Sequence, residues 1–600
     1  MFEFPAAHYR RWVWALSRRS QADPLAPILA SLTYRYREVF QMKRLTTYLI
    51  AALLLLGLAG LPHAFSQNTD SAPAENGVAA IDPQAPLFEG LGDTHHPIST
   101  TSPLAQTYFD QGLVLAYGFN HAEAARSFRE AARLDPDCAM CHWGLAYVLG
   151  PNINAAMADD AVPEAYIAIQ RAQELSDRAT PLERAYIAAM AQRYPASPVE
   201  DRSELDRAYA EAMGQVVQQY PDDLDAAVLY AEALMDTTPW NYWTEDDQPR
   251  EATRKLLDSL ESVLSHDPNH PGANHLYIHA VEAVHPEWAE ATADRLATLV
   301  PGAGHLVHMP SHIYINVGRY HDAAVSNQAA ISADDDYVTQ CHAQGLYPLA
   351  YIPHNEHFLW SSAAMEGQGE LSIQTARELA ASVNRDLMPE LGVLQHFYAI
   401  PYYGLARFGR WQEILAEPAP EVNLPYPMGV WHYARGMAFA NTGQLEQAEQ
   451  ELARVKAIAA DPELEAVTVF DINSVARLME ISKEVLSGEI ARQSGDLETA
   501  IAALETAVEL EDALIYNEPE DWYLPVRQIL GAALLEADRP EAAEAVYRQD
   551  LVAHERNGWS LFGLTQSLEA QGRSDEAQMV RDRFDEAWQY ADVELTASRL

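Results

Sequence analysis

The segment Ala105–Cys138, with the sequence AQTYFDQGLVLAYGFNHAEAARSFREAARLDPDC, determines the fold class of this chain. Small, aromatic and helix-ending residues occur in it at fixed intervals, at Gly112, Ala124, Phe128, Ala131 and Pro136. This spacing predicts two antiparallel helices that end at the proline. One such pair cannot bury its apolar face alone, so neighbouring pairs must stack against it.

The same pattern returns along the chain, in the segments Pro310–Ala323, Tyr433–Ala448, Leu530–Ala542 and Leu561–Ala577. A repeat of about 34 residues with this pattern is typical of the tetratricopeptide repeat (TPR). Because a solenoid grows by adding neighbours, all 600 residues need no division into globular domains. The sequence therefore predicts an all-α fold, an α-solenoid in which antiparallel helix pairs form a TPR superhelix. We expect one array at residues 101–420 and a second at residues 421–600.

Residues 42–66 have the features of a secretory signal peptide. Met42-Lys-Arg precedes an apolar run, Leu49–Leu61, and a small-residue cleavage site at Ala64–Ser66. We therefore expect residues 1–41 to be a non-native N-terminal extension and residues 67–100 to be a flexible leader. The mature protein is predicted to be periplasmic or secreted. It has no other run of roughly 20 apolar residues, so we expect no transmembrane segment in it.

The chain is strongly acidic, with 86 Asp and Glu against 40 Lys and Arg and a formal net charge of −46. Binding to nucleic acid needs a basic surface, so nucleic acid is excluded as a partner. We interpret most of this charge as a solvated acidic surface. The composition leaves the oligomeric state open.

Histidines recur with the period of the repeat. His275 and His279 are followed 33 residues later by His308 and His312 (308 − 275 = 312 − 279 = 33). A spacing of four places both members of a pair on one helical face, and stacked repeats bring the pairs together. In tetratricopeptide proteins generally, the matching positions line the concave groove. The resemblance therefore implies that seven histidines face one cavity: His275, His279, His305, His308, His312, His354 and His357.

Such a cluster predicts a metal site, because imidazole suits zinc, copper, iron and nickel. One ion uses about four or five ligands, so the seven histidines predict one or two transition-metal ions. We expect Glu232 and Glu282 to hold the ligating histidines in place or to act as bases. Met309 could add a soft thioether, which together with export favours copper over zinc or iron.

Two aromatic connections are expected beside the groove, Pro239–Trp243 and Tyr347–Pro353. They could wall a substrate pocket or simply pack an inserted loop. If the histidines instead serve a TPR scaffold that binds a peptide or protein partner, they should be separated and solvated.

The segment Cys138-Ala-Met-Cys141-His142 matches the attachment motif of c-type haem. Export would supply the compartment that this attachment requires. The alternative is a disulfide or a pair of structural thiols at the start of a helix.

Three histidine-rich segments resemble a largely uncharacterised family of exported bacterial tetratricopeptide-repeat proteins. They are HLYIHAVE at His275–Glu282, GHLVHMPSHIY at Gly304–Tyr314 and PHNEHFLW at Pro353–Trp360. The resemblance covers nearly all of the chain after residue 100 and implies the fold and the compartment, but no reaction. In that family the residue that matches His142 is often tyrosine, which disfavours haem.

Three functions follow as hypotheses. The first is a periplasmic metalloprotein that binds one or two ions through histidines on the concave face; whether it is also a metal-dependent enzyme is left open. The second is an interaction scaffold. The third is a monohaem electron carrier that uses His142.

Overall fold

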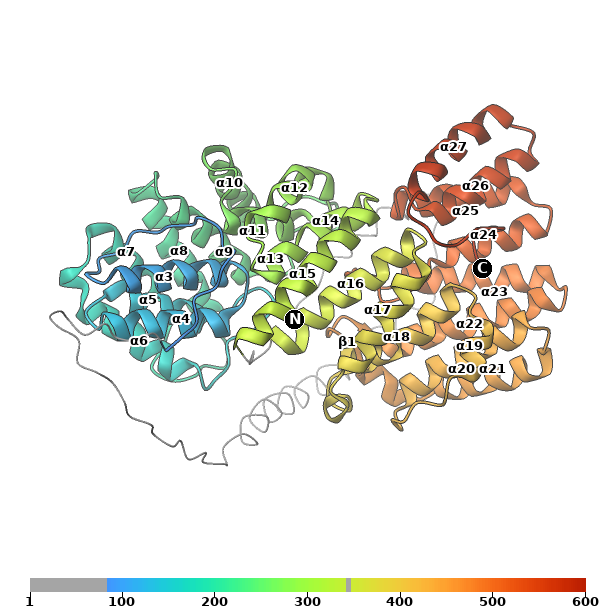
Figure 1. Ribbon diagram of the computed structural model, residues 1–600, viewed down its shortest axis with the longest axis horizontal. Helices are drawn as coiled ribbons and strands as arrows, with labels where there is room; N and C mark the ends of the chain where they lie inside the picture. The colour runs from blue at the N-terminus through green and yellow to red at the C-terminus, as the bar shows by residue number, and fades with distance from the viewer. Residues whose placement is uncertain (1–83, 342–346) are drawn as a thin grey trace, which may run out of the picture. The chain divides into compact units, whose positions relative to one another are not determined.

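The computed structural model describes residues 84–341 and 347–600, and Figure 1 shows its helices. The predicted extension at residues 1–41, the signal peptide at 42–66 and the first part of the predicted leader lie outside the described residues.

Helices make up most of the described part (Figure 1). The first are α3 (Pro103–Tyr117), α4 (His121–Leu134), α5 (Ala139–Val148), α6 (Val162–Glu174), α7 (Pro181–Met190), α8 (Ser203–Gln219), α9 (Leu224–Thr237), α10 (Glu251–His266) and α11 (Pro271–Val281). The next are α12 (Glu290–Leu299), α13 (Gly304–His308), α14 (Pro310–Asn316), α15 (Tyr320–Cys341), α16 (Ile352–Met365), α17 (Gly369–Ser382), α18 (Gly392–Arg407) and α19 (Trp411–Ala416). The last are α20 (Pro425–Asn441), α21 (Leu445–Ala459), α22 (Val475–Gln493), α23 (Leu497–Asp512), α24 (Val526–Glu536), α25 (Pro540–Ala553), α26 (Gly558–Ala570) and α27 (Ser574–Ala587).

Short elements join some of these helices. They are the 3-10 turns η2 (Ser176–Arg178), η3 (Pro286–Ala289), η5 (Arg385–Leu387) and η6 (Pro462–Ala466), the π-turn η4 (Tyr347–Tyr351) and the strands β1 (Thr468–Val469) and β2 (Asn473–Ser474). The two strands pair antiparallel, with Val469 opposite Asn473. No helix in the described part is long and apolar enough to cross a membrane.

Helices that follow one another pack as pairs, among them α3 with α4, α20 with α21 and α22 with α23. The first pair shows why the sequence pattern works. A Cβ added to Gly112 of α3 would lie 2.8 Å from the Phe128 ring, and one added to Gly144 of α5 would lie 2.3 Å from it. Phe128 of α4 therefore packs between Gly112 and Gly144. The spacing of small and aromatic residues in the sequence reflects this contact. The predicted all-α array of helix pairs is confirmed.

The buried side chains form two hydrophobic cores. One extends from Ala85 to Tyr351 and the other from Trp360 to Phe584. They meet at α16, which contributes to both, so the core does not divide at the boundary predicted near residue 420.

The flexible leader predicted for residues 67–100 does not extend through residues 84–100. Tyr108 donates a hydrogen bond to the carbonyl of Ala85, and the amide of Phe88 donates to the side chain of Gln111. The amide of Gly302 donates to the carbonyl of Gly90. These bonds fix the segment against α3 and against the turn before α13, because its backbone groups find partners there.

Two C-terminal connections reach the helices that carry the histidines. A Cβ added to Gly318, which has a φ of 75°, would lie 2.2 Å from the carbonyl oxygen of Glu555. The indole of Trp559 donates to the carbonyl of Ala364 at the end of α16. The connection between α23 and α24, which carries Glu518, lies against α14, since Tyr516 accepts a hydrogen bond from Asn316 at 3.1 Å.

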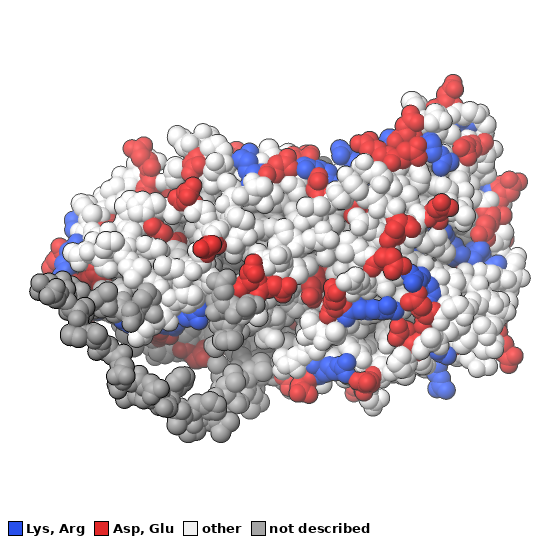
Figure 2. All heavy atoms as spheres, in the orientation of Figure 1, with Lys and Arg blue, Asp and Glu red and all other residues white. Residues whose placement is uncertain are grey.

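Charged side chains are spread over the surface. Figure 2 shows Asp and Glu scattered over the visible face with Lys and Arg beside several of them. This distribution agrees with a solvated acidic surface.

Candidate metal centre

Proline occupies the first turn of three helices that carry histidines, α11, α14 and α16. Pro271 and Pro310 each occupy the first turn of a helix, α11 and α14, where a missing amide hydrogen costs nothing. His275 and His279 follow one turn apart on α11. Pro310 also separates the short helix α13 from α14, so that His308 lies at the junction and His312 inside α14, as expected from the sequence.

Three histidines converge in a first group, which we call triad 1: His275, His279 and His305. One ring nitrogen of each lies within 4.8 Å of the others. The ring centroids of His275 and His305 are 4.9 Å apart, and those of His275 and His279 are 4.8 Å apart. All three side chains are buried, the most exposed at 4%.

The hydrogen bonds of triad 1 occupy only some of its ring nitrogens. His275 donates from Nδ1 to the carbonyl oxygen of Tyr117 at 2.5 Å, since a carbonyl can only accept. The Nδ1 of His279 lies 3.2 Å from the carboxylate of Glu282. Within the described residues, the Nε2 atoms of His275 and His279 and both ring nitrogens of His305 have no hydrogen-bond partner.

A second group, triad 2, consists of His308, His312 and His354, again with ligand atoms within 4.8 Å of one another. The Nε2 atoms of His308 and His312 are 2.9 Å apart. His308 donates from Nδ1 to the Oδ1 of Asn327 at 2.7 Å, and the amide of Asn327 is oriented by its own bond to Ala323. His354 on α16 is half-buried, and its Nδ1 has no partner in the described part of the chain.

Two carboxylates connect these groups. One oxygen of Glu282 faces His279, and the other lies 3.2 Å from the Nδ1 of His312. Glu518 contacts the same Nδ1 of His312 and accepts a hydrogen bond from Asn316. Glu282, His312 and Glu518 thereby form a third buried group of potential ligands.

Aromatic rings cover both triads. Phe119 packs on triad 1, with its centroid 4.5 Å from that of His275, and Trp240 lies edge-on at 5.3 Å from His279. Phe358 packs on triad 2, at 4.7 Å from His308 and 4.5 Å from His312. A metal held here would be shielded from water, which strengthens its electrostatic interactions.

The surroundings set the charge of the imidazoles. Burial and the neighbouring imidazoles hold the pKa of His275, His305, His308 and His354 well below the ordinary value. These rings are therefore neutral at neutral pH, the form in which histidine binds metals. Burial acts the same way on His312, but Glu282 and Glu518 outweigh it and raise its pKa to about 10. Burial raises the pKa of Glu518 to about 7.

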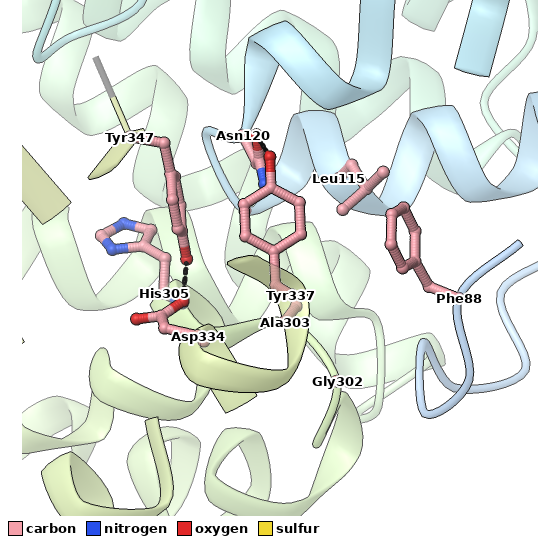
Figure 3. A pocket seen from close by; sticks show the side chains of 11 residues that line it. Phe88, Leu115, Asn120, Gly302, Ala303, His305, Asp334, Tyr337 and Tyr347 are labelled. Atoms are coloured by element: carbon pink, nitrogen blue, oxygen red, sulfur yellow. Dashed lines mark hydrogen bonds between the residues drawn. The ribbon is translucent and has the colours of Figure 1, made fainter. Parts of the chain in front are cut away.

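A small pocket reaches triad 1 at His305. Its lining joins the segment at Phe88, the end of α3 and the start of α13 to Tyr337 and Tyr347 (Figure 3). The Tyr347 hydroxyl accepts a hydrogen bond from the backbone amide of His305 and donates to the carboxylate of Asp334, so it fixes the start of α13. Tyr351 packs edge-on against the His305 ring at 4.8 Å. The two aromatic connections expected beside the histidines thus lie there, Trp240 at His279 and Tyr347 with Tyr351 at His305.

Three predicted site residues lie elsewhere. His357 joins none of the groups found among the described residues; it stacks on Trp360 at 5.4 Å and lies 5.5 Å from His396. Glu232 accepts a hydrogen bond from Tyr147 rather than from a histidine. Met309 is fully buried in the hydrophobic core and belongs to neither triad.

The structure joins Cys138 and Cys141 in a disulfide. Both cysteines are fully buried, and the amide of Cys141 donates to the sulfur of Cys138 at the start of α5. Attachment of haem would use both sulfurs as thioethers, so the structure supports the disulfide alternative. His142 lies at 3.4 Å from the carbonyl of Pro136.

Glu518 and Asn327 could not be recognised from the sequence as partners of the histidines. Glu518 is 206 residues away from His312 along the chain. It lies in the connection between α23 and α24, where potential metal ligands do not recur at a regular spacing. Asn327 lies on α15 at a distance of 19 residues from His308. Only its position one helix after the histidines could have suggested it.

One family model matches the chain, that of the tetratricopeptide repeat, over residues 485–513. These residues span the end of α22 and all of α23. No curated protein matches the chain.

Solved structures of other repeat proteins align with most of it. The human IFIT1 dimer with PPP-AAAA has 12% identity over 81% of this chain and 92% of that chain, with a TM-score of 0.26. The TPR domain of P58(IPK) has 11% identity over 80% and 98%, with a TM-score of 0.22. The Cut9–Hcn1 hetero-tetramer of APC/C has 14% identity over 80% and 96%, with a TM-score of 0.23. At these values the likenesses carry no inference about function. The helix pairs of the described part and the family-model match together make this chain an all-α solenoid of tetratricopeptide type.

Proposed function

We propose that this chain is a metalloprotein that binds a transition-metal ion at triad 1, through His275, His279 and His305. The observation that carries the proposal is the arrangement of their ring nitrogens. In the described structure, His275 and His279 each anchor Nδ1 on an oxygen and leave a buried Nε2 without a partner, and one ring nitrogen of each lies within 4.8 Å of one of His305. Metal-binding histidines have this geometry, because the outer hydrogen bond fixes the ring and its tautomer.

The energetics point the same way. A buried polar group without a partner costs about 1–3 kcal/mol. Triad 1 contains four such nitrogens in the described structure, in a space closed by Phe119. Natural proteins rarely tolerate such a concentration unless a ligand satisfies it. A metal ion would accept three of these lone pairs at once.

The ligand set favours an ion that accepts three imidazoles. Zinc, copper and iron all do so, and three protein ligands leave a coordination position open for water or a substrate. Met309 was the reason to favour copper among them, and its place in the core removes that reason. The proposed export to an oxidising compartment is then the only remaining reason to favour copper.

The disulfide between Cys138 and Cys141 supports a proposed export to the periplasm or the exterior, because disulfides persist in oxidising compartments. A scaffold that uses the histidines to contact a peptide would keep them separated and solvated. Triad 1 is buried and convergent instead, so a peptide or protein partner, which the TPR fold suggests, would use other surfaces of the repeats.

The proposal is tested by elemental mass spectrometry on the purified chain. We expect zinc, copper or iron in the wild type, and one ion per chain fewer in His275→Asn and His305→Asn. The matched control is His432→Asn, since His432 also pairs with a glutamate, Glu451, at 2.6 Å but lies outside the triads. A metal content that is unchanged in both variants, or a wild type that takes up no metal even with excess zinc, would refute the proposal.

A further inference from the structure

We infer that triad 2 is a second metal site, in which His308, His312 and His354 bind an ion and Glu518 from the α23–α24 connection holds His312 in place. This inference goes beyond the site at triad 1 and uses a residue more than 200 positions away from its histidine partner. The ligand is a divalent transition-metal ion that accepts three imidazole nitrogens, of which Zn²⁺ is the probe used below.

The two closest ring nitrogens carry the argument. His308 must donate from Nδ1, because the Oδ1 of Asn327 can only accept. The Nδ1 of His312 donates as well, to a carboxylate oxygen of Glu518, and an oxygen of Glu282 lies 3.2 Å from the same nitrogen. Each ring then has one remaining nitrogen, Nε2, and the two Nε2 atoms lie 2.9 Å apart. With His312 protonated, its Nε2 donates to the lone pair of His308 across this contact. Without that proton, both Nε2 atoms carry lone pairs that one metal ion can accept.

The position of His354 distinguishes these two possibilities. A shared proton would use only the two facing nitrogens. One ring nitrogen of His354 lies within 4.8 Å of the ligand atoms of His308 and His312, and its Nδ1 has no hydrogen-bond partner among the described residues. Its ring is held edge-on against Phe358 at 4.8 Å and Phe470 at 5.9 Å. A third ring nitrogen within reach of the other two is required by a metal site and not by a proton.

The carboxylates make the two sites differ in a measurable way. Glu282 contacts one histidine of each triad. Glu518 contacts His312 and no other triad histidine in the described structure. A carboxylate that accepts the outer hydrogen bond of a metal-binding histidine typically changes metal affinity by about 10- to 100-fold when it is removed. Loss of Glu282 should therefore weaken both sites, and loss of Glu518 should weaken only the second.

Zinc stoichiometry tests the inference. We expect the full chain, stripped with a chelator and titrated with Zn²⁺, to bind two ions by calorimetry and by elemental mass spectrometry. His354→Asn should bind one ion and keep the site at triad 1, and His305→Asn should bind one ion and keep the site at triad 2. Circular dichroism checks that each variant is folded.

Affinity then tests the role of Glu518. We expect Glu518→Gln to weaken one of the two Zn²⁺ sites by about 10- to 100-fold and Glu282→Gln to weaken both. Glu366→Gln is the matched control, because Glu366 is a buried glutamate that lies 3.2 Å from His321 and is in neither triad. It should change neither affinity.

The outcomes separate this inference from the proposed function. One ion per wild-type chain that disappears in His305→Asn but not in His354→Asn would overturn the second site and leave the first. One ion that disappears only in His354→Asn would do the reverse. Two ions whose affinities are both unchanged in Glu518→Gln would overturn the role given to Glu518.

Discussion

Replacing His305 by phenylalanine should stabilise the metal-free protein and destabilise the metal-bound one. Both ring nitrogens of His305 are buried without a hydrogen-bond partner in the described structure, and its ring packs between Phe119 and Tyr351. Phenylalanine keeps an aromatic ring in this place and removes both polar atoms. We therefore expect His305 to lower the stability of the metal-free protein while it provides a ligand for the metal.

The magnitude follows from these contacts. Two unpartnered groups at about 1–3 kcal/mol each give about 2–6 kcal/mol in favour of the variant. The larger ring costs about 1–3 kcal/mol through overpacking. With the middle of each range, the net gain in the free energy of unfolding without metal is about 2 kcal/mol. In zinc at about 100 times the dissociation constant, the wild type gains about 2.7 kcal/mol from triad 1 that the variant cannot gain, so the order reverses.

Thermal unfolding in chelator and in excess zinc measures both effects. A change of 1 kcal/mol shifts the midpoint by about 2–4 °C for a cooperative unit of 150–250 residues. His357→Phe is the matched control, because both of its ring nitrogens are also buried and unpartnered, but it lies outside the triads. It should stabilise the protein in both conditions and leave the zinc-dependent gain unchanged. The reasoning fails if zinc stabilises His305→Phe as much as the wild type, or if His357→Phe alone loses the gain.

Three further predictions concern the repeats and their surroundings. Gly144→Ala should lower the free energy of unfolding, measured by chemical denaturation, by about 1–3 kcal/mol, because the added Cβ would lie 2.3 Å from the Phe128 ring. Gly118→Ala is the control and should change the free energy of unfolding much less, because its added Cβ would lie 3.4 Å from the nearest atom. Burial raises the pKa of Asp334 to about 7, so the folded state binds a proton that the unfolded state releases near pH 4, and stability falls as pH rises between these values. Asp334→Asn should not show this loss. The free energy of unfolding of the wild type minus that of the variant should therefore fall by about 2–3 kcal/mol from pH 5 to pH 8. A difference that stays constant over this pH range would contradict the raised pKa of Asp334. Intact mass spectrometry should show the chain lighter by two hydrogens for the Cys138–Cys141 disulfide and without covalent haem, and a mass increased by haem would reverse that assignment.

Part of the candidate site follows directly from sequence spacing. Histidines four residues apart share a helical face, and histidines one repeat apart become spatial neighbours when repeats stack. For this reason, the sequence alone predicts that His275, His279, His308 and His312 lie together. The same argument placed His357 with them, but spacing fixes the face of a helix only roughly, and the ring of His357 lies against Trp360 and His396.

The sequence by itself determined the helix pairs, since the contacts that define them join residues within one or two repeats, as the packing of Phe128 against Gly112 and Gly144 shows. Only the tertiary structure decided how the histidines divide into two triads and which oxygens orient them. Glu518 is brought to His312 across 206 residues, and the bond from His275 to the carbonyl of Tyr117 spans 158 residues. Such contacts depend on how whole repeats pack against one another, and no local pattern in the chain encodes the direction in which a ring nitrogen points.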